Sequence, residues 1–372
     1  MSKRVKLGNE ILLEENLSLI KGKKVGLVTN HTGVTGDLQN LANILHSHAE
    51  VDLTALFSPE HGLYGHVYAE GIVESSVDKN TNLPVYSLYP HGLTDAMLKN
   101  IDVILFDLWD IGARYFTYIY TMAMVLEAAG KMKLPVFILD RPNPNGYYVD
   151  GPVLQKEYAS FVGLHPVPIV YGLTIAEYAT MVNGEGWLKD GVKCNLKYIT
   201  VDDYNHSYYY ILPVQTSPNL PNMDAVYLYP SLCLFEGTVI SVGRGTDFPF
   251  QVFGHPLLKK SKSSFVPQSN SGSANPLYKG DTCYGYKLNN FSESYIRSLG
   301  QLYLFWLQET CNELKDPCTF FNSYFDKLAG NSVLKQQIIS GMSEEDIRKS
   351  WQSDLVKYKE IRKKYLLYPD FD

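Results

Sequence analysis

Polar residues that can do chemistry follow several apolar runs in the first half of the chain. Glu60 and His61 stand between Pro59 and Gly62, and this spacing predicts that both lie on a loop at the end of a strand. A glutamic acid in such a place can act as a general acid when burial raises its pKa. A polar loop without a catalytic role is the alternative that the spacing leaves open.

Three arginines are candidates for binding a carboxylate. Arg114 and Arg141 follow apolar runs, and Arg244 lies in the glycine-rich segment GRGTD. A guanidinium group held in a turn is suited to bidentate contact with a carboxylate. A salt bridge to a nearby aspartate, such as Arg244 to Asp247, is the structural alternative.

Further polar residues stand at the ends of other apolar runs. Asn30 ends one run and opens the turn NHTGVTG, which lacks the lysine of a P-loop and the GxGxxG spacing of a dinucleotide site. A ligand role and a plain helix cap are both open for Asn30. Asp107 and Asp110 follow a second run, and Asn143 follows a third. Ligands of open parallel sheets bind beyond the carboxyl ends of the strands, so we expect these ends to converge on one site.

Motifs for several other chemistries are missing from the sequence. There is no G-x-S-x-G elbow and no cysteine–histidine signature, which disfavours acyl-enzyme chemistry. The five cysteines form no C-x-x-C pair and there is no H-E-x-x-H, so we expect no metal site. A disulfide between Cys311 and Cys318 is an alternative only in an oxidising compartment.

Apolar runs that alternate with helical patterns predict the elements that position these residues. Strands are predicted over 24–30, 51–57, 84–88, 101–108 and 135–139, and helices over 38–46, 113–131 and 174–183. Strands separated by helices imply a parallel sheet. We therefore predict an α/β protein whose residues 1–230 form a Rossmann-like, doubly wound, mainly parallel sheet. For residues 231–372 the pattern predicts a smaller α+β domain. It contains an exposed loop over 259–275, one helix that begins at 294 and another over 344–364.

The composition indicates a globular protein and excludes several functional classes. The chain has 372 residues, a net charge of −6 and a pI near 5.9. That balance argues against a generic nucleic-acid binder or a protein of anionic membrane surfaces. Hydrophobic residues make up 45% of the chain, yet no run approaches the roughly 18 apolar residues that span a bilayer.

Seven segments, in order from about Val5 to Tyr368, carry a resemblance to one bacterial family. They are VGLVTNHTGVTG, LFSPEHGLYG, FDLWDIGARYFTYIYTM, LDRPNPNG with DGPVL, SPNLPN, CLFEGTVISVGRGTD with PFQVFG, and FDKLAG with IRKKYLLY. Together they are similar to the exo-β-N-acetylmuramidases, which were long known only as a domain of unknown function.

The resemblance implies a glycosidase that releases β-linked N-acetylmuramic acid from the non-reducing end of peptidoglycan fragments. It implies an active site in the cleft between the two domains, with the catalytic glutamate at Glu60. It implies no cofactor, no metal and no nucleic acid, and its expected partner is a muropeptide or disaccharide substrate. The resemblance favours the periplasm or secretion. The opening segment MSKRVKLGNEILLEENL has no apolar core of signal-peptide type, which leaves the cytoplasm open.

Glycoside cleavage normally uses two carboxyl groups, and only the first is assigned by the resemblance. Our hypothesis makes Glu60 the general acid, with His61 orienting or polarising beside it. The second carboxylate stays open among four residues, Asp107, Asp110, Glu236 and Asp247.

Recognition of N-acetylmuramic acid requires a partner for its lactyl carboxylate, and the candidates are again Arg114, Arg141 and Arg244. Aromatic rings that can stack on sugar faces are supplied by Tyr64, Tyr115 and Tyr118. Two other functions are alternatives: another exo-hexosaminidase acting on amino sugars, or a protein that binds muropeptides without cutting them.

Overall fold

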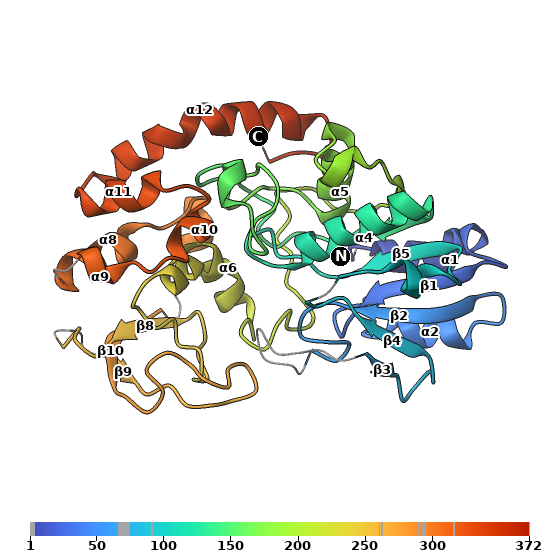
Figure 1. The fold of residues 1–372 in the computed structure, drawn as a ribbon, viewed down its shortest axis with the longest axis horizontal. Helices are drawn as coiled ribbons and strands as arrows, with labels where there is room; N and C mark the ends of the chain where they lie inside the picture. Colours follow the sequence, from blue (N-terminus) through green and yellow to red (C-terminus); the bar gives the residue numbers. More distant parts are fainter. Residues whose placement is uncertain are drawn as a thin grey trace.

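A large sheet in the first half of the chain and a small sheet in the second half organise the molecule (Figure 1). The computed structural model describes residues 4–65, 75–90, 92–259, 261, 263–288, 291, 295–314 and 317–371. Among them, no helix has the length and apolar character needed to cross a membrane.

The large sheet has the strand order of a doubly wound fold. Its seven strands are β1 (Lys24–Thr29), β2 (Asp52–Ser58), β3 (Ser76–Val77), β4 (Pro84–Ser87), β5 (Val103–Asp107), β6 (Pro135–Leu139) and β7 (Asn195–Ile199). They lie in the order β3-β4-β2-β1-β5-β6-β7, and every pair is parallel except β3 with β4. The order of the parallel strands reverses between β1 and β5, which is the switch point of such sheets. The predicted fold class is therefore confirmed.

The central strand β5 shows why the sequence folds in this way. All five of its residues are fully buried. Val103 and Leu105 pack on one face of the sheet, with side chains from α1 (Gly8–Glu15) and α2 (Leu41–Ser47). Ile104 and Phe106 pack on the other face, with side chains from α4 (Tyr118–Met132) and α5 (Ile175–Glu185). Four consecutive apolar residues, 103–106, suit a strand covered by helices on both faces.

Two of the predicted helices begin later than their patterns indicate. The helix expected from Leu38 begins after Asn40, whose side chain accepts a hydrogen bond from the N–H of Asn43. The helix expected from Ala113 begins at Tyr118, which leaves residues 113–117 as irregular backbone. That irregular segment reaches the cavity described below.

The second half contains more regular structure than its glycine, proline and aromatic residues indicate. Its elements are α6 (Met223–Leu232), the 3-10 helix Cys233–Gly237, β8 (Val252–His255), β9 (Ser263–Phe265), β10 (Cys283–Lys287), α7 (Arg297–Leu299), α8 (Phe305–Leu314), α9 (Pro317–Phe320), α10 (Phe325–Ala329), α11 (Val333–Ile339) and α12 (Glu344–Lys363). The expected boundary at residues 230 and 231 falls inside α6, which contains Pro230. The loop expected over 259–275 contains the short strand β9, and α12 confirms the predicted last helix.

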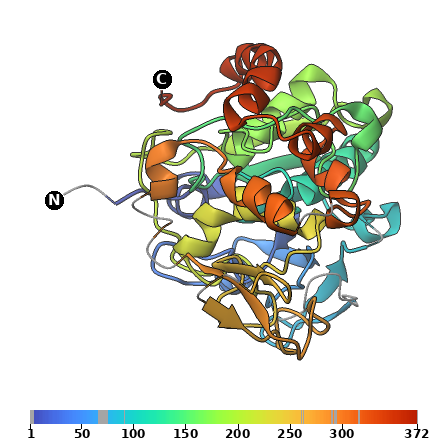
Figure 2. The ribbon, with the colours of Figure 1, turned by 90° about the vertical axis from the view of Figure 1, so that its left-hand side faces the viewer.

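The C-terminal helix α12 returns the chain to the large sheet. It runs along the top of the molecule towards α5 (Figure 1), and Figure 2 shows it at the end opposite the small sheet. After α12, the hydroxyl of Tyr368 donates a hydrogen bond to Asp140 at 2.5 Å, and the backbone N–H of Leu367 donates to Glu177 at 2.8 Å. Both carboxylates belong to the first half, so the two halves share one set of buried polar contacts.

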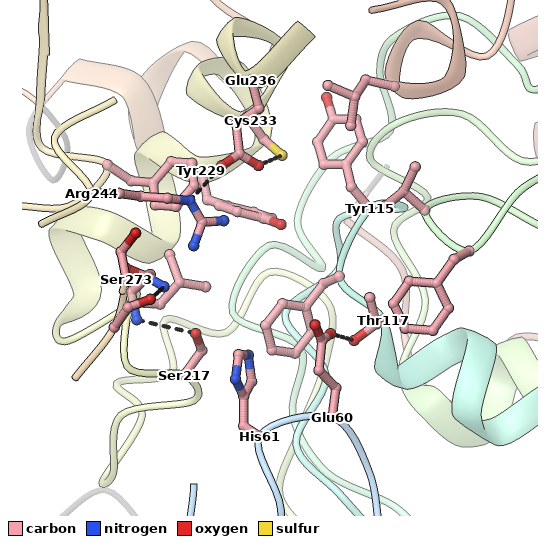
Figure 3. A pocket seen from close by; sticks show the side chains of 18 of the residues that line it. Glu60, His61, Tyr115, Thr117, Ser217, Tyr229, Cys233, Glu236, Arg244 and Ser273 are labelled. Atoms are coloured by element: carbon pink, nitrogen blue, oxygen red, sulfur yellow. Dashed lines mark hydrogen bonds and ion pairs between the residues drawn. The ribbon is translucent and has the colours of Figure 1, made fainter. Parts of the chain in front are cut away.

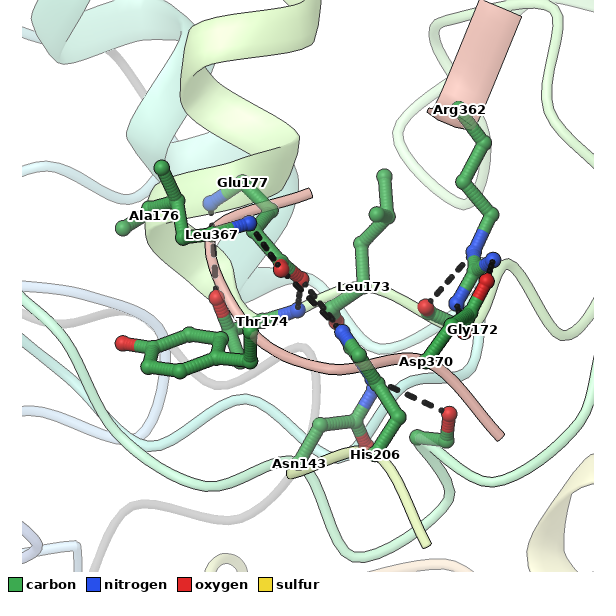
Figure 4. Close-up of polar contacts among 12 residues, drawn as sticks. Asn143, Gly172, Leu173, Thr174, Ala176, Glu177, His206, Arg362, Leu367 and Asp370 are labelled. Carbon is green, nitrogen blue, oxygen red and sulfur yellow. Dashed lines mark hydrogen bonds and ion pairs between the residues drawn. The ribbon is translucent and has the colours of Figure 1, made fainter. Parts of the chain in front are cut away.

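The residues around Glu177 hold this C-terminal segment in place (Figure 4). Glu177 forms a capping box with Thr174 at the start of α5, where the sequence predicts a helix. It also pairs with the buried His206, whose Nε2 lies 3.0 Å from a carboxylate oxygen of Glu177. Arg362 of α12 makes a bidentate ion pair with Asp370, at 2.7 Å for each contact. We call the segment 364–371 with these contacts the C-terminal clasp.

Candidate active site

A cavity of about 800 Å³ lies between residues of the two halves. Its volume is within the roughly 300–1,000 Å³ of small-molecule sites. One wall comes from the loops after β2 and β5, and the opposite wall comes from α6, the 3-10 helix that follows it and the glycine-rich loop. Figure 3 shows Glu60 and His61 pointing into the cavity from the first wall, with Glu236 and Arg244 across from them.

The loop after β2 presents Glu60 and His61 to the cavity. Both side chains are largely buried, with 8% and 7% of their surface exposed. His61 has a φ of 71°, a left-handed conformation that costs free energy for a residue other than glycine. Gly65 closes the loop against His31, because a Cβ atom at Gly65 would lie 2.3 Å from the His31 ring. The residue types of this motif therefore fix the path of the loop.

Thr117 ties Glu60 to the first turn of α4. Its hydroxyl donates a hydrogen bond to Oε2 of Glu60 at 2.8 Å. Thr117 is the N-cap residue of α4, so the position of the Glu60 carboxyl group depends on where that helix begins. The late start of α4 thus places Thr117 at the cavity instead of inside a helix.

Glu236 and Arg244 form an ion pair on the opposite wall. Nε of Arg244 lies 2.5 Å from Oε1 of Glu236, and the two side chains are 24% and 22% exposed. Burial alone would lower the pKa of Arg244, but the Glu236 carboxylate raises it above its ordinary value. The guanidinium lies over the ring of Phe250, 5.0 Å from its centroid. Within the part of the chain that the structure describes, the two terminal nitrogens of Arg244 have no hydrogen-bond acceptor.

Cys233 contacts the second oxygen of Glu236. The sulfur lies 3.6 Å from Oε2, and the two residues are three positions apart in a 3-10 helix, where such side chains lie one above the other. Burial raises the pKa of the Cys233 thiol well above its ordinary value, so the thiol remains protonated and donates to Glu236. Glu236 is therefore held at both oxygens.

Five of the residues singled out from the sequence for the site line the cavity: Glu60, His61, Tyr118, Glu236 and Arg244. Tyr115, which was expected to stack on a sugar, lines it as well. Asn30 lies one step behind the wall, where its Nδ2 donates to the hydroxyl of Tyr118 at 2.6 Å.

Two of the three candidate arginines are turned away from the cavity. Arg114 is buried and donates to four backbone carbonyls, those of Pro152, Val167, Leu328 and Ala329. Arg141 is paired with Asp107, with Nη2 at 2.6 Å from Oδ1, and its guanidinium lies over the ring of Trp109. Both guanidinium groups thus make their contacts inside the protein, and neither arginine lines the cavity.

The candidate aspartates are also placed elsewhere. Asp107 has Arg141 as its partner. Asp110 is buried, accepts hydrogen bonds from the hydroxyl of Tyr171 and the N–H of Gly112, and has its pKa raised to about 6 by burial. Asp247 is exposed and does not line the cavity, and it is not the partner of Arg244. Of the four candidates for a second carboxylate, Glu236 is the one that the structure brings to the cavity.

Tyr64 and Asn143 lie outside the cavity as well. The hydroxyl of Tyr64 donates to Asp78, and 47% of this side chain is exposed. Asn143 is buried and donates to the carbonyl of Leu173 at 2.8 Å. Both residues follow a strand of the large sheet, but neither side chain points into the cavity.

Sequence reasoning missed several cavity residues. Thr117 lies inside a quoted motif, but only its contact with Glu60 reveals its position. Phe161 and Tyr89 belong to none of the motifs and line the cavity, as does the segment 272–277, of which residues 272–275 were expected only as part of an exposed loop. Among the described residues, no group of three or more histidine, cysteine or acidic side chains is arranged to hold a metal ion.

Comparison with protein families identifies the chain. A family model for the N-terminal part of the exo-β-N-acetylmuramidase NamZ matches residues 25–224, and the corresponding C-terminal model matches residues 227–368. The chain belongs to the NamZ exo-β-N-acetylmuramidase family. This confirms the resemblance found in the sequence motifs.

Relatives of the NamZ family cover nearly the whole chain. The peptidoglycan β-N-acetylmuramidase NamZ of Bacillus subtilis is 37% identical, over 98% of this chain and 92% of that protein. A crystal structure of a DUF1343 family protein from Bacteroides fragilis is 39% identical, with a TM-score of 0.91, and covers 99% of this chain and all of that chain. A second DUF1343 protein of that organism is 31% identical, with a TM-score of 0.82, and covers 98% of this chain and 99% of that chain.

Proposed function

We propose that this protein is an exo-acting β-N-acetylmuramidase that releases N-acetylmuramic acid from the non-reducing end of peptidoglycan fragments. The observation that carries the proposal is the cavity in which Glu60 faces Glu236 and Arg244 from the other half of the chain. Membership in the NamZ family and the activity named for the Bacillus subtilis relative support it.

Arg244 is our proposed partner of the lactyl carboxylate. Glu236 occupies its Nε, while Nη1 and Nη2 form a fork that faces the cavity (Figure 3). Such a fork matches the two oxygens of a carboxylate. Because Phe250 supports the guanidinium from one face, the fork is ordered before substrate binds.

In this proposal Glu60 donates a proton to the glycosidic oxygen as the bond to the anomeric carbon breaks. Glu236 supplies the second carboxylate, whose negative charge stabilises the positive charge that develops on the sugar ring. Water then adds to the anomeric carbon and gives one proton to the ionised Glu60 carboxylate, so Glu60 is protonated again when free N-acetylmuramic acid leaves. His61 borders Glu60 in the cavity and orients the reacting groups there.

The test is hydrolysis of a chromogenic β-N-acetylmuraminide beside the matching β-N-acetylglucosaminide. We expect the wild type to cleave the muraminide and Glu60→Gln to lose about 10²- to 10⁴-fold in kcat. Glu309→Gln, at an exposed position on α8, is the matched control and should keep wild-type activity.

Each outcome separates the proposed activity from an alternative. Cleavage of both sugars at similar rates would indicate a broader hexosaminidase. Binding of muropeptides without any cleavage would indicate a binding protein. Full activity of Glu60→Gln would remove Glu60 from the mechanism.

A further inference from the structure

Two separate groups of aromatic rings lie at the cavity, and every ring named below except Tyr120 lines it. In the first group, Phe116 contacts Tyr229 edge to face, Tyr229 contacts Phe250 in the same way, and Phe250 lies under Arg244. In the second group, Phe161 contacts Tyr89 at a ring-centroid distance of 5.3 Å and Tyr120 at 4.8 Å. Among the described residues, no ring contact joins the two groups.

Glu60 lies between these two groups. Thr117, which holds Glu60, stands in the chain between Phe116 of the first group and Tyr120 of the second. Figure 3 shows Arg244 on one side of Glu60, and Thr117 with the start of α4 on the other. Tyr120 belongs to α4, so Phe161, which contacts it, also lies on the side of Glu60 away from Arg244.

The order Arg244, Glu60, Phe161 has a chemical meaning if Glu60 protonates the glycosidic oxygen. The sugar that carries the lactyl carboxylate then lies between Arg244 and Glu60. The sugar that leaves must lie on the far side of Glu60, against Phe161 and Tyr89. Both rings line the cavity and are half-buried, so part of each ring is exposed to a ligand in the cavity.

We infer that Phe161 and Tyr89 form the binding site for the leaving sugar, an N-acetylated hexosamine ring joined through its hydroxyl to N-acetylmuramic acid. The inference rests on the proposed function, because it takes Glu60 as the proton donor. The apolar face of a pyranose ring packs on the Phe161 ring, and its hydroxyl edge faces the polar part of the cavity. This pair determines which leaving group the enzyme accepts, whereas Arg244 determines which sugar it releases.

The kinetic test compares two muraminides in wild type and Phe161→Ala. One is the disaccharide of N-acetylmuramic acid and N-acetylglucosamine, and the other is methyl β-N-acetylmuraminide, whose leaving group is too small to stack. We expect Phe161→Ala to lower kcat/KM for the disaccharide about tenfold and to leave the methyl glycoside unchanged within about twofold. An equal loss for both substrates, or no loss for the disaccharide, would overturn the inference.

Two controls keep the result interpretable. Phe248→Ala removes a phenyl ring that is 39% exposed and does not line the cavity, and it should leave both substrates unaffected. Phe161→Leu keeps an apolar side chain of similar bulk but has no flat ring, so it should fold like the wild type and show the same selective loss. A selective loss in Phe248→Ala as well would count against the assignment.

A binding measurement separates this inference from the proposed activity. Calorimetry with free N-acetylglucosamine and the Glu60→Gln protein reports the leaving-sugar site without turnover. We expect Phe161→Ala in that background to weaken binding about tenfold. If the wild type hydrolysed no muraminide but bound this sugar through Phe161, the activity would fail and the binding site would stand. Unchanged binding would refute the site whatever the activity.

Discussion

Two arginine–carboxylate pairs in this protein have the same chemistry and different surroundings. Arg141 and Asp107 are 1% and 0% exposed, next to the switch point of the large sheet. Arg244 and Glu236 are 24% and 22% exposed, at the wall of the cavity. The buried pair also engages the carbonyl of Val34 and the ring of Trp109, whereas the other keeps two nitrogens directed at the cavity. The first pair serves the fold, and the second is available to a ligand.

The largest effect is expected from breaking the buried pair. Arg141→Met leaves Asp107 without its cation in a site that water does not reach, so we expect the free energy of unfolding to fall by about 3–5 kcal/mol. Urea unfolding measures this change. Lys349→Met removes an exposed partner of Glu345 on α12, and it should leave the free energy of unfolding close to that of the wild type. If the two variants were equally stable, the structural role of Arg141 would be refuted.

The next effect is expected from the cavity pair. Arg244→Ala should weaken binding of the transition state by about 2–4 kcal/mol. This corresponds to a loss on the order of 30- to 1,000-fold in kcat/KM for a β-N-acetylmuraminide. Most of the loss should fall on KM, because the lactyl carboxylate is bound before the reaction. Arg244→Lys keeps the positive charge but has no pair of terminal nitrogens. Its kcat/KM should lie between those of the wild type and Arg244→Ala. Wild-type kinetics for Arg244→Ala would exclude it as the carboxylate site.

Asp110 offers a third contrast, because it is a buried carboxyl group that has no guanidinium partner among the residues that the structure describes. Burial raises its pKa to about 6 in the folded protein, against 3.8 as its ordinary value. The folded state therefore binds more protons than the unfolded state between these values, and Asp110 lowers stability as the pH rises from about 4 to about 6. Asp110→Asn has no carboxyl group to ionise and does not suffer this loss. When the pH is raised from 4 to 7, the free energy of unfolding of Asp110→Asn should therefore increase by about 1–3 kcal/mol relative to that of the wild type.

The measurement for Asp110 is urea unfolding at several pH values. Asp247→Asn, at an exposed position, serves as the control and should show no such trend. A constant difference between Asp110→Asn and wild type across this range would mean that Asp110 ionises normally.

The smallest effect concerns the left-handed backbone of His61. His61→Gly removes the steric cost of the φ of 71°, so we expect the protein to gain about 0.5 kcal/mol or to stay as stable as the wild type. Activity should fall at the same time, since the imidazole leaves the cavity. Unfolding and hydrolysis assays on one preparation test both parts. A large loss of stability would show that His61 serves the fold, as Arg141 does.

The sequence predicts the sheet and one wall of the cavity well, for physical reasons. Strands such as β5 are apolar over several consecutive positions, here 103–106, and few other structures accommodate such runs. Glu60 and His61 are recognisable because a proline and a glycine confine them to a loop after a strand. The helix α6 is missed because Pro230 lies within it, where the sequence indicates a break.

The roles of the three arginines are beyond the reach of the sequence. Each stands near acidic residues and turns, and the local pattern does not show which way the side chain leaves the backbone. Arg114 finds its acceptors at residues 152 and 167 and at residues 328 and 329, more than 200 positions away. Only the assembled fold shows that both of its terminal nitrogens are already used. Phe161 is missed for a related reason, because an aromatic residue in a loop carries no signal of what it faces.

The C-terminal clasp has a consequence for how the protein is made. While the chain is being synthesised, Asp140 and Glu177 remain without their last partners until Tyr368 and Leu367 have emerged. The sheet of the first half therefore reaches its final stability only when nearly the whole chain is available. The two halves that the family models describe separately are therefore expected to fold as one cooperative unit.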